Sequence, residues 1–203
     1  MSENSILLII TGAPGTGKSF LARQIQERYP FFSILSYDDV KERYFDKFGF
    51  SDANEKTALN RLALEKFYVL VEEKMKCNAP LIMEYPFYQL HKPILSQFAD
   101  QYAYIPITVY LYAEDAILAA RCQERDQDAR RHPGHLHNFY HKGTPPADPL
   151  PPMDIDHFLK MTHGKQYNVS LGEVVEINVN DYSQIDLAPL WDLLESLVAR
   201  FQD

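Results

Sequence analysis

The chain has 203 residues, of which 46% are hydrophobic, and its formal net charge is −8 at pH 7. This length suits one α/β domain that carries a lid, so we expect a single domain over residues 1–203. The negative charge argues against a general binder of nucleic acids or membrane surfaces, because both are polyanionic. The chain lacks an apolar run long enough to cross a bilayer, and its first residues lack a basic leader, so we expect a cytoplasmic protein. Its cysteines, Cys77 and Cys122, are then expected to be buried and reduced.

The most specific stretch follows an apolar run over residues 6–10, which predicts a strand buried on both faces. Residues 18–29 after it predict a helix. Between them the chain fits the phosphate-loop pattern G-x-x-x-x-G-K-[ST], as Gly12-Ala13-Pro14-Gly15-Thr16-Gly17-Lys18-Ser19. A glycine-rich loop between a strand and a helix is the context in which this pattern binds phosphates.

The composition of the loop explains its chemistry. Glycines let backbone N–H groups converge on phosphate oxygens, and the helix N-terminus adds unpaired donors and partial positive charge. Lys18 is expected to reach the β- and γ-phosphates, and the Ser19 hydroxyl is expected to bind Mg²⁺. We therefore predict that residues 12–19, together with Phe20, hold the nucleotide.

The rest of the chain alternates between predicted strands and helices. Further strands are expected at 32–36, 81–84, 105–112 and 174–179, and further helices at about 54–76, 89–101, 115–129, 154–163 and 185–201. Another helix is expected to begin at Asp38 or Asp39, either of which could cap it. This alternation predicts a parallel sheet with helices on both faces, a three-layer α/β/α fold, with the ligand beyond the carboxyl ends of the strands.

Periodicity disappears from residue 130 to residue 152, a stretch rich in histidine and proline. A structureless segment of this length inside a compact domain is usually a functional lid or is disordered, and we expect a mobile lid over about 125–152. Its histidines could suggest zinc, but they lack a nearby set of cysteines, which favours histidines that face solvent or substrate. They are His132, His135, His137 and His141.

Two further motifs resemble those of a known family. Ser36-Tyr37-Asp38-Asp39-Val40-Lys41 is similar to the S-x-D-x-hydrophobic-basic signature of small P-loop kinases, and Arg121 and Arg125 resemble the R-x-x-x-R at the entrance to their lid. These are the ATP-dependent kinases often labelled as AAA-domain proteins, and their relatives include gluconate, shikimate and adenylylsulfate kinases, chloramphenicol phosphotransferase and zeta toxins. The resemblance covers about residues 5–130 and the fifth strand, but neither 44–76 nor 131–165.

The resemblance implies a P-loop NTPase sheet of five parallel strands in the order 2-3-1-4-5, with ATP and Mg²⁺ as ligands. It implies that Asp38 orients the acceptor hydroxyl and takes its proton, with Asp39 as the competing candidate. Glu84 falls where many relatives have an aspartate that holds Mg²⁺ through water, although the longer glutamate leaves direct contact open. A role on the magnesium side or the substrate side is expected, with a plain surface acid at the end of a strand as the alternative. It also implies that Arg121 and Arg125 face the nucleotide or its phosphates.

The lid offers two more candidates. Arg130 and Arg131 could close onto the phosphates, because a guanidinium binds spread phosphoryl charge bidentately. Of these two, we expect Arg130 to join Lys18, Asp38 and Arg125 as a catalytic residue. Arginines near a helix C-terminus can instead simply complement the helix dipole.

The acceptor side is expected in a helical segment over about 38–76. Aromatic side chains there either pack in the core or form a wall for a ring-bearing acceptor: Tyr37, Tyr44, Phe45, Phe48, Tyr85, Phe87 and Tyr88. We expect a phosphotransferase that moves the γ-phosphate of ATP to a hydroxyl of a small molecule. The alternatives are a nucleotide-dependent ATPase or switch with a protein partner, and a toxin-like kinase of nucleotide sugars.

Overall fold

The computed structural model describes residues 5–145 and 153–199. Its strands are β1 (Ser5–Thr11), β2 (Ser33–Ser36), β3 (Leu81–Glu84), β4 (Tyr104–Tyr112) and β5 (Glu173–Asn178). Its α-helices are α1 (Lys18–Arg28), α2 (Tyr37–Phe48), α3 (Ala53–Lys76), α4 (Lys92–Gln101), α5 (Asp115–Asp126), α6 (Pro133–Leu136), α7 (Ile155–Thr162) and α8 (Ala188–Ala199). Two short 3₁₀-helices, η1 (Gln89–His91) and η2 (Tyr182–Gln184), complete the described elements.

The five strands form one parallel sheet in the order β2-β3-β1-β4-β5, which confirms the predicted P-loop fold. Ile10 of β1 is paired with Glu84 of β3, and Glu84 is paired with Ser36 of β2. The three strands therefore end at the same level. Whatever follows Ile10, Ser36 and Glu84 in the chain must meet at this edge of the sheet.

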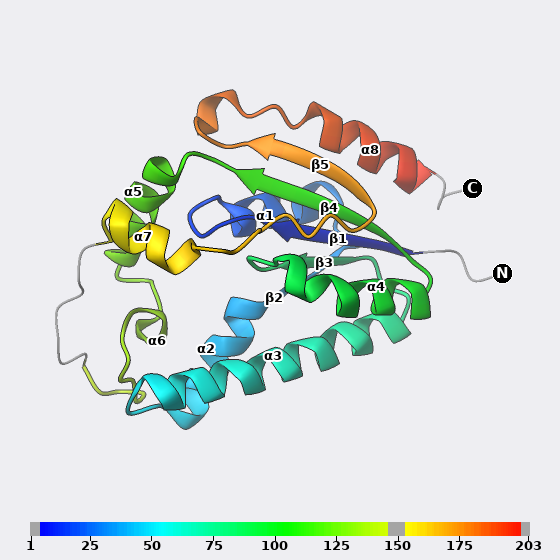
Figure 1. Ribbon diagram of the computed structural model, residues 1–203. Helices are drawn as coiled ribbons and strands as arrows, with labels where there is room; N and C mark the ends of the chain where they lie inside the picture. The colour runs from blue at the N-terminus through cyan, green and yellow to red at the C-terminus, as the bar shows by residue number, and fades with distance from the viewer. Residues whose placement is uncertain (1–4, 146–152, 200–203) are drawn as a thin grey trace.

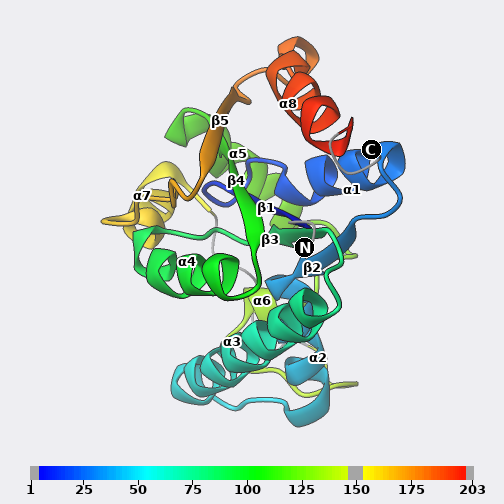
Figure 2. The ribbon, with the colours of Figure 1, turned by 90° about the vertical axis from the view of Figure 1, so that its right-hand side faces the viewer.

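Helices cover both faces of the sheet and enclose two cores (Figure 1, Figure 2). On one face Leu8 and Ile10 pack with α1 and α8, whose Leu190 and Leu194 are fully buried. On the other face Leu7 and Ile9 pack with α2, α3 and α4. Because successive side chains of β1 point to opposite faces, a continuous apolar run serves both cores at once, as expected for a central parallel strand.

Several boundaries differ from those predicted. Helix α2 begins at Tyr37 with Ser36 as its N-cap residue, so Asp38 and Asp39 lie in its first turn and neither is the cap. Helix α8 begins at Ala188 instead of residue 185, because the Asp186 side chain accepts a hydrogen bond from the Ala188 N–H and Pro189 suits the first turn. The expected end of that helix, including residue 201, lies outside the described residues.

The expectation of two buried thiols was half wrong. Cys122 is buried, whereas Cys77 is exposed where α3 ends, and both are free. Within residues 5–145 and 153–199, none of the helices combines the length and apolar content needed to cross a membrane.

The described part of the expected lid, residues 125–145, is not a separate arm. It contains α6, which the sequence did not predict, and it packs against the α2–α3 pair (Figure 1). Phe50 and Tyr140 form an antiparallel bridge, and their rings join Phe45 and Leu59 in a small apolar cluster. Lys56 of α3 donates to the carbonyl oxygens of His135 and His137 at 3.3 and 2.7 Å. The remaining part of the lid, residues 146–152, lies outside the described residues.

Gly172, just before β5, provides a test of this fold. Its φ is +68°, and a Cβ there would lie 1.8 Å from the Pro106 carbonyl oxygen of β4. Gly172→Ala should therefore lower the free energy of unfolding by about 2–5 kcal/mol, through overpacking added to left-handed strain. Chemical denaturation would measure it. Gly164→Ala is the matched control, because its φ is +70° but no atom lies within 4 Å of the added Cβ. Equal losses in the two variants would show that the β4 contact does not matter.

Candidate active site

The phosphate loop joins β1 to α1 and adopts a backbone shape that requires glycine. Gly12 has φ +145°, and a Cβ on it would lie 2.3 Å from the Leu111 carbonyl oxygen of β4. Gly17 has φ +85° and forms the N-cap of α1. The loop is fixed from within, since the Thr16 hydroxyl donates to the Ala13 carbonyl at 2.9 Å. Its backbone N–H groups are thus arranged as a cradle at the helix N-terminus, which fits a phosphate chain.

Lys18 lies inside this cradle. Its Nζ donates to the carbonyl oxygens of Gly12 and Ala13 at 3.1 and 3.0 Å, and its side chain is buried. Burial lowers the pKa of Lys18 to about 8, although Glu84 and Asp38 partly oppose the shift. A buried ammonium held only by neutral carbonyls lacks a direct counter-ion, so phosphate charge would stabilise it.

Glu84, at the end of β3, lies below the loop and is buried. Burial raises the pKa of Glu84, while Lys18 and hydrogen bonds from Ser19 and Ser36 act in the opposite direction. A carboxylate and a hydroxyl at this position are hard oxygen donors of the kind that Mg²⁺ binds, together with phosphate oxygens and water. Ser19 and Glu84 therefore fit a magnesium ion on the phosphate side, as the sequence suggested.

Asp38 lies in the first turn of α2. It faces Lys18 across the space between α2 and the phosphate loop, which we call the hollow. Its Oδ1 lies 2.6 Å from Lys41 Nζ, one turn along the same helix. Burial alone would raise the pKa of Asp38, but the positive charges around it, chiefly that of Lys41, hold this pKa far below its usual value. Asp38 is therefore ionised at neutral pH. Asp39 is more exposed than Asp38, and partial desolvation of its carboxyl, together with the charge of Glu42, raises its pKa.

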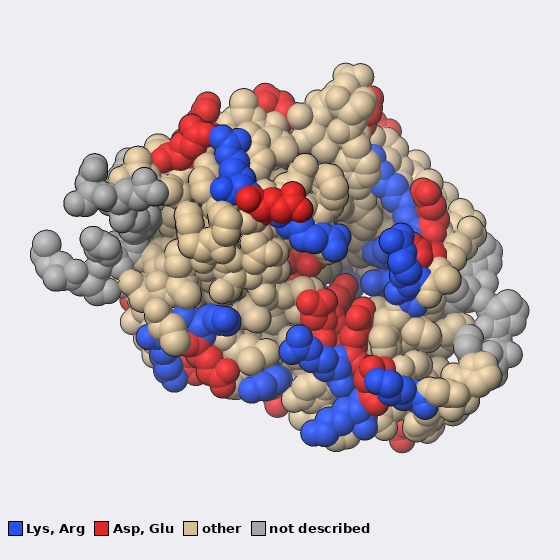
Figure 3. Space-filling view, turned by 180° about the vertical axis from the view of Figure 1, so that it is seen from behind, with Lys and Arg blue, Asp and Glu red and all other residues tan. Residues whose placement is uncertain are grey.

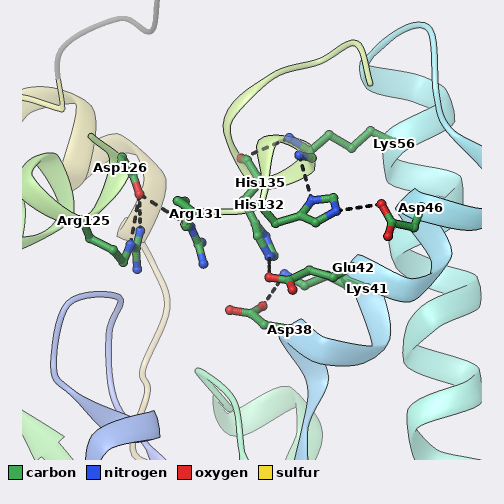
Figure 4. A network of polar contacts seen from close by, with 11 residues as sticks. Asp38, Lys41, Glu42, Asp46, Lys56, Arg125, Asp126, Arg131, His132 and His135 are labelled. Carbon is green, nitrogen blue, oxygen red and sulfur yellow. Dashed lines mark hydrogen bonds and ion pairs between the residues drawn. The ribbon is translucent and has the colours of Figure 1, made fainter. Parts of the chain in front are cut away.

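The arginines of the lid face different directions (Figure 4). Arg125 pairs with Asp126 at 2.9 Å and lies near enough to Lys18 to lower the pKa of that lysine. Arg131 reaches into the space between the phosphate loop and Asp38, and its Nε is buried without a hydrogen-bond partner among the described residues. Arg130 instead has a 90% exposed side chain and pairs with Asp128 at 2.6 Å. The structure thus brings Arg125 and Arg131 to the hollow, but not Arg130.

A row of carboxylates along α2 holds the lid segment in place (Figure 4). Glu42 lies 2.8 Å from His135 Nε2, and Asp46 lies 3.2 Å from His132 Nε2. Tyr140 and Lys142 also bind Asp46, at 2.5 and 2.8 Å. Three of the predicted histidine positions are therefore structural partners: His132 and His135 bind α2, and the backbone carbonyl of His137 binds Lys56. Within the described residues no group of three or more His, Cys, Asp or Glu side chains could hold a metal ion.

Sequence reasoning missed Tyr182, which lies beside the phosphate loop and next to Arg121. Arg121 donates to the carbonyl oxygens of Val179 and Asn180 at 2.7 and 3.0 Å, and its guanidinium lies 3.8 Å from the ring centre of Tyr182. The Tyr182 hydroxyl donates to the Gly15 carbonyl at 3.1 Å, so this ring lies against the outer side of the phosphate loop. Tyr182 follows β5, and its place at the ligand edge of the sheet was the signal that could have identified it.

The surface view from behind shows how these charges are arranged (Figure 3). Acidic side chains gather near the middle of that face, over the position of α2, and basic side chains surround them. A hollow lies beside the acids. Figure 3 thus shows the acidic side chains over α2 on one side of the hollow.

The lowered pKa of Lys18 predicts a pH dependence for ATP binding. Below about pH 8 the ammonium is charged and binds phosphate, so ATP affinity should fall as pH rises from 7 to 9.5 in calorimetric titrations. The stability of the ligand-free protein should change in the opposite direction. Between pH 8 and the unfolded value of 10.5 the unfolded chain binds more protons, so this lysine favours folding increasingly as pH rises. Lys18→Met should remove both trends, and an unchanged pH profile in that variant would contradict the assignment.

The lid contacts predict a change in hydrogen exchange. Asp46→Asn removes the charge that holds Tyr140, Lys142 and His132, so amides at the Phe50–Tyr140 bridge should exchange about tenfold faster, as expected for the loss of a charge-assisted bond. Asp128→Asn is the control, since that residue pairs with the exposed Arg130. Slow exchange in both variants would show that apolar packing alone holds the segment.

Comparisons with known proteins agree with this architecture. A "putative kinase" of Chloroflexus aurantiacus J-10-fl superimposes with a TM-score of 0.76 at 24% identity, over 96% of this chain and 98% of that one. A gluconokinase from Sinorhizobium meliloti 1021 superimposes with a TM-score of 0.57 at 14% identity, over 97% of each chain. Identities this low show a shared fold and no more. No curated protein matches the chain significantly.

The sequence comparison goes further than the fold. Residues 8–138, more than half of the 203-residue chain, match the family described as the AAA domain. The match includes the phosphate loop, Asp38, Glu84 and the arginines of α5 and the lid. The chain belongs to the AAA domain family and has the fold of a small P-loop kinase.

Proposed function

We propose that the protein is a Mg²⁺- and ATP-dependent phosphotransferase whose acceptor is a hydroxyl group of a small molecule. The observation that carries this proposal is the position of Asp38. An ionised carboxylate lies close enough to the phosphate loop to oppose the fall in the pKa of Lys18, yet binding ATP does not require it. A group transfer does require such a residue, because the acceptor oxygen must be aimed at the γ-phosphate.

The parts of the site have separate tasks in this proposal. The loop amides and Lys18 hold the β- and γ-phosphates. Tyr182 and Arg121 would lie on the side where the adenine base binds. Ser19 and Glu84 would hold Mg²⁺, which would neutralise charge on the phosphates when bound. Arg131 and Arg125 face the position of the transferred phosphoryl group and would neutralise charge that develops there. In this assignment Arg131 takes the place that the sequence gave to Arg130.

The transfer itself forms one bond and breaks one. The acceptor oxygen bonds to the γ-phosphorus while the bond from that phosphorus to the β,γ-bridging oxygen breaks, and ADP leaves with those electrons. The hydroxyl proton passes to Asp38. Because its pKa is so low, Asp38 is a weak base, so its main contribution is to orient the hydroxyl, with proton transfer late in the reaction.

The lid contacts suggest how water is excluded. Since α6 is bound to α2 and α3, the acceptor side and the inner part of the lid would move as one unit toward the phosphate loop. Arg131, on this segment, would then approach the γ-phosphate as the acceptor does. Closure of this kind limits hydrolysis of ATP in the absence of an acceptor.

Asp38→Asn tests the proposal. Asn preserves the shape of the side chain and can still accept a hydrogen bond from Lys41, so folding and ATP affinity should be nearly unchanged. Turnover should fall about a hundred- to ten-thousandfold, the usual cost of losing a general base. Phosphotransfer would be followed with labelled ATP and a library of hydroxyl compounds, and ATP binding by calorimetry.

Asp39→Asn is the matched control on the neighbouring, exposed position. If only Asp39→Asn is inactive, the roles of the two aspartates are exchanged. If the wild-type protein hydrolyses ATP but phosphorylates nothing, and both variants behave like it, the proposal fails. A nucleotide-dependent switch with a protein partner would then explain the phosphate loop better.

A further inference from the structure

The segment that joins β3 to η1, which we call the wall, carries tyrosine hydroxyls but no charged side chain. Between β3 and η1 the chain runs Tyr85-Pro86-Phe87-Tyr88-Gln89-Leu90, without an ionisable acid or base apart from tyrosine. This segment is fixed to the end of β1, because the Thr11 hydroxyl lies 2.7 Å from the carbonyl oxygens of both Phe87 and Tyr167. The segment is followed by His91, at the end of η1. Burial lowers the pKa of this imidazole, which favours its neutral form.

Three tyrosines bring their hydroxyls to this wall. Tyr85 lies close enough to Asp38, Tyr88 and Tyr167 for their charges to affect its pKa. Burial raises the pKa of Tyr85 and raises that of Tyr167 to about 12, so both remain neutral donors. Within the described residues, the hydroxyls of Tyr85, Tyr88 and Tyr167 make no hydrogen bond. Such groups are suited to the hydroxyls of a bound molecule.

The position that a cationic acceptor would need is already occupied. An ammonium would be attracted to the space between the Asp38 carboxylate and the neighbouring aromatic rings. Lys41 Nζ lies there, 2.6 Å from Asp38 and 5.0 and 6.0 Å from the ring centres of Tyr37 and Tyr85. The Asp38–Lys41 pair therefore carries no net charge, and it does not disfavour an uncharged ligand.

An anionic acceptor would find no unpaired cation on this wall among residues 5–145 and 153–199. Lys41 is paired with Asp38, and Lys56 points its Nζ at the carbonyl oxygens of His135 and His137 (Figure 4). Arg131 points into the space between the phosphate loop and Asp38, away from this wall. A carboxylate or phosphate against Tyr85 and Tyr88 would be desolvated without a partner, which is costly.

We infer that the acceptor is an uncharged compound with several hydroxyl groups on a ring, of the sugar or cyclitol class. One hydroxyl would lie on Asp38 and lose its proton there as its oxygen bonds to the γ-phosphorus. The others would bind the hydroxyls of Tyr85, Tyr88 and Tyr167, and the ring would pack against the aromatic side chains. This inference rests on the proposed function and narrows its substrate.

The test compares acceptors that differ in charge on similar carbon skeletons. Glucose and myo-inositol are the neutral probes, gluconate is the acid and glucosamine is the amine, each supplied with ATP and Mg²⁺. ADP release and phosphorylated product would be measured, and kcat/KM should be about tenfold or more higher for a neutral probe than for either charged one. A preference for gluconate or glucosamine would overturn the inference and leave phosphotransfer intact. If none of the four is phosphorylated, the inference fails, and the wider hydroxyl library decides the proposed function separately.

Substitutions of the wall tyrosines test whether their hydroxyl groups contact the acceptor. Tyr88→Phe and Tyr85→Phe should each lower kcat/KM for the neutral probe about five- to tenfold, the cost of one hydrogen bond, without changing the affinity for ATP. Tyr102→Phe is the control, because Tyr102 lies at the C-terminal end of α4 and its hydroxyl donates to Glu72 of α3 instead of facing the site. Unchanged kinetics in both wall variants, with normal folding by circular dichroism, would show that these hydroxyls do not contact the acceptor.

Discussion

The site depends first on the register of three parallel strands. Because Ile10, Glu84 and Ser36 lie side by side, the phosphate loop, the Glu84 carboxylate and the first turn of α2 must share one edge. A slip of one strand by one residue, about 3.3 Å along the sheet, would displace one of these groups from the others and turn that strand's side chains to the wrong face. The register is in turn fixed by apolar side chains that must lie on the correct face, so the two cores hold the catalytic geometry.

The distribution of charge follows from the need to bury ions in pairs. Lys18 departs from this rule, since it is buried against neutral oxygen atoms, and its lowered pKa reflects the resulting cost. Asp38 with Lys41 and Arg125 with Asp126 are each compensated locally. Arg131 is compensated less well, with its nearest carboxylate oxygen, on Asp126, at 3.8 Å. The two poorly compensated cations, Lys18 and Arg131, flank the same hollow, which is where a phosphoryl group would be stabilised most.

The acceptor side is built differently from the phosphate side. Its lid segment is held to α2 by histidine–carboxylate pairs and a tyrosine, and its inner wall is made of neutral aromatic residues. Charged and hydrogen-bonded pairs thus hold the lid segment to α2, whereas the surface that would face the acceptor carries hydroxyl groups. In the proposed function this separation would let the protein attract a polyanionic nucleotide while it offers a neutral environment to the acceptor.

The sequence by itself determined the fold class, the strand order through its resemblance to small P-loop kinases, and the phosphate loop. These are local or periodic signals: a buried apolar run, a glycine pattern and alternating elements. It also predicted Asp38 and Glu84 at the ligand edge, because the ends of parallel strands meet there, and it predicted Arg125 near the phosphates through the resemblance to small P-loop kinases. The directions of Arg130 and Arg131, the binding of the lid to α2, and the position of Tyr182 depended on the tertiary structure. Each of these rests on contacts between segments far apart in the chain, such as Asp46 with Tyr140 and Tyr182 with Gly15, and local sequence patterns do not encode such contacts.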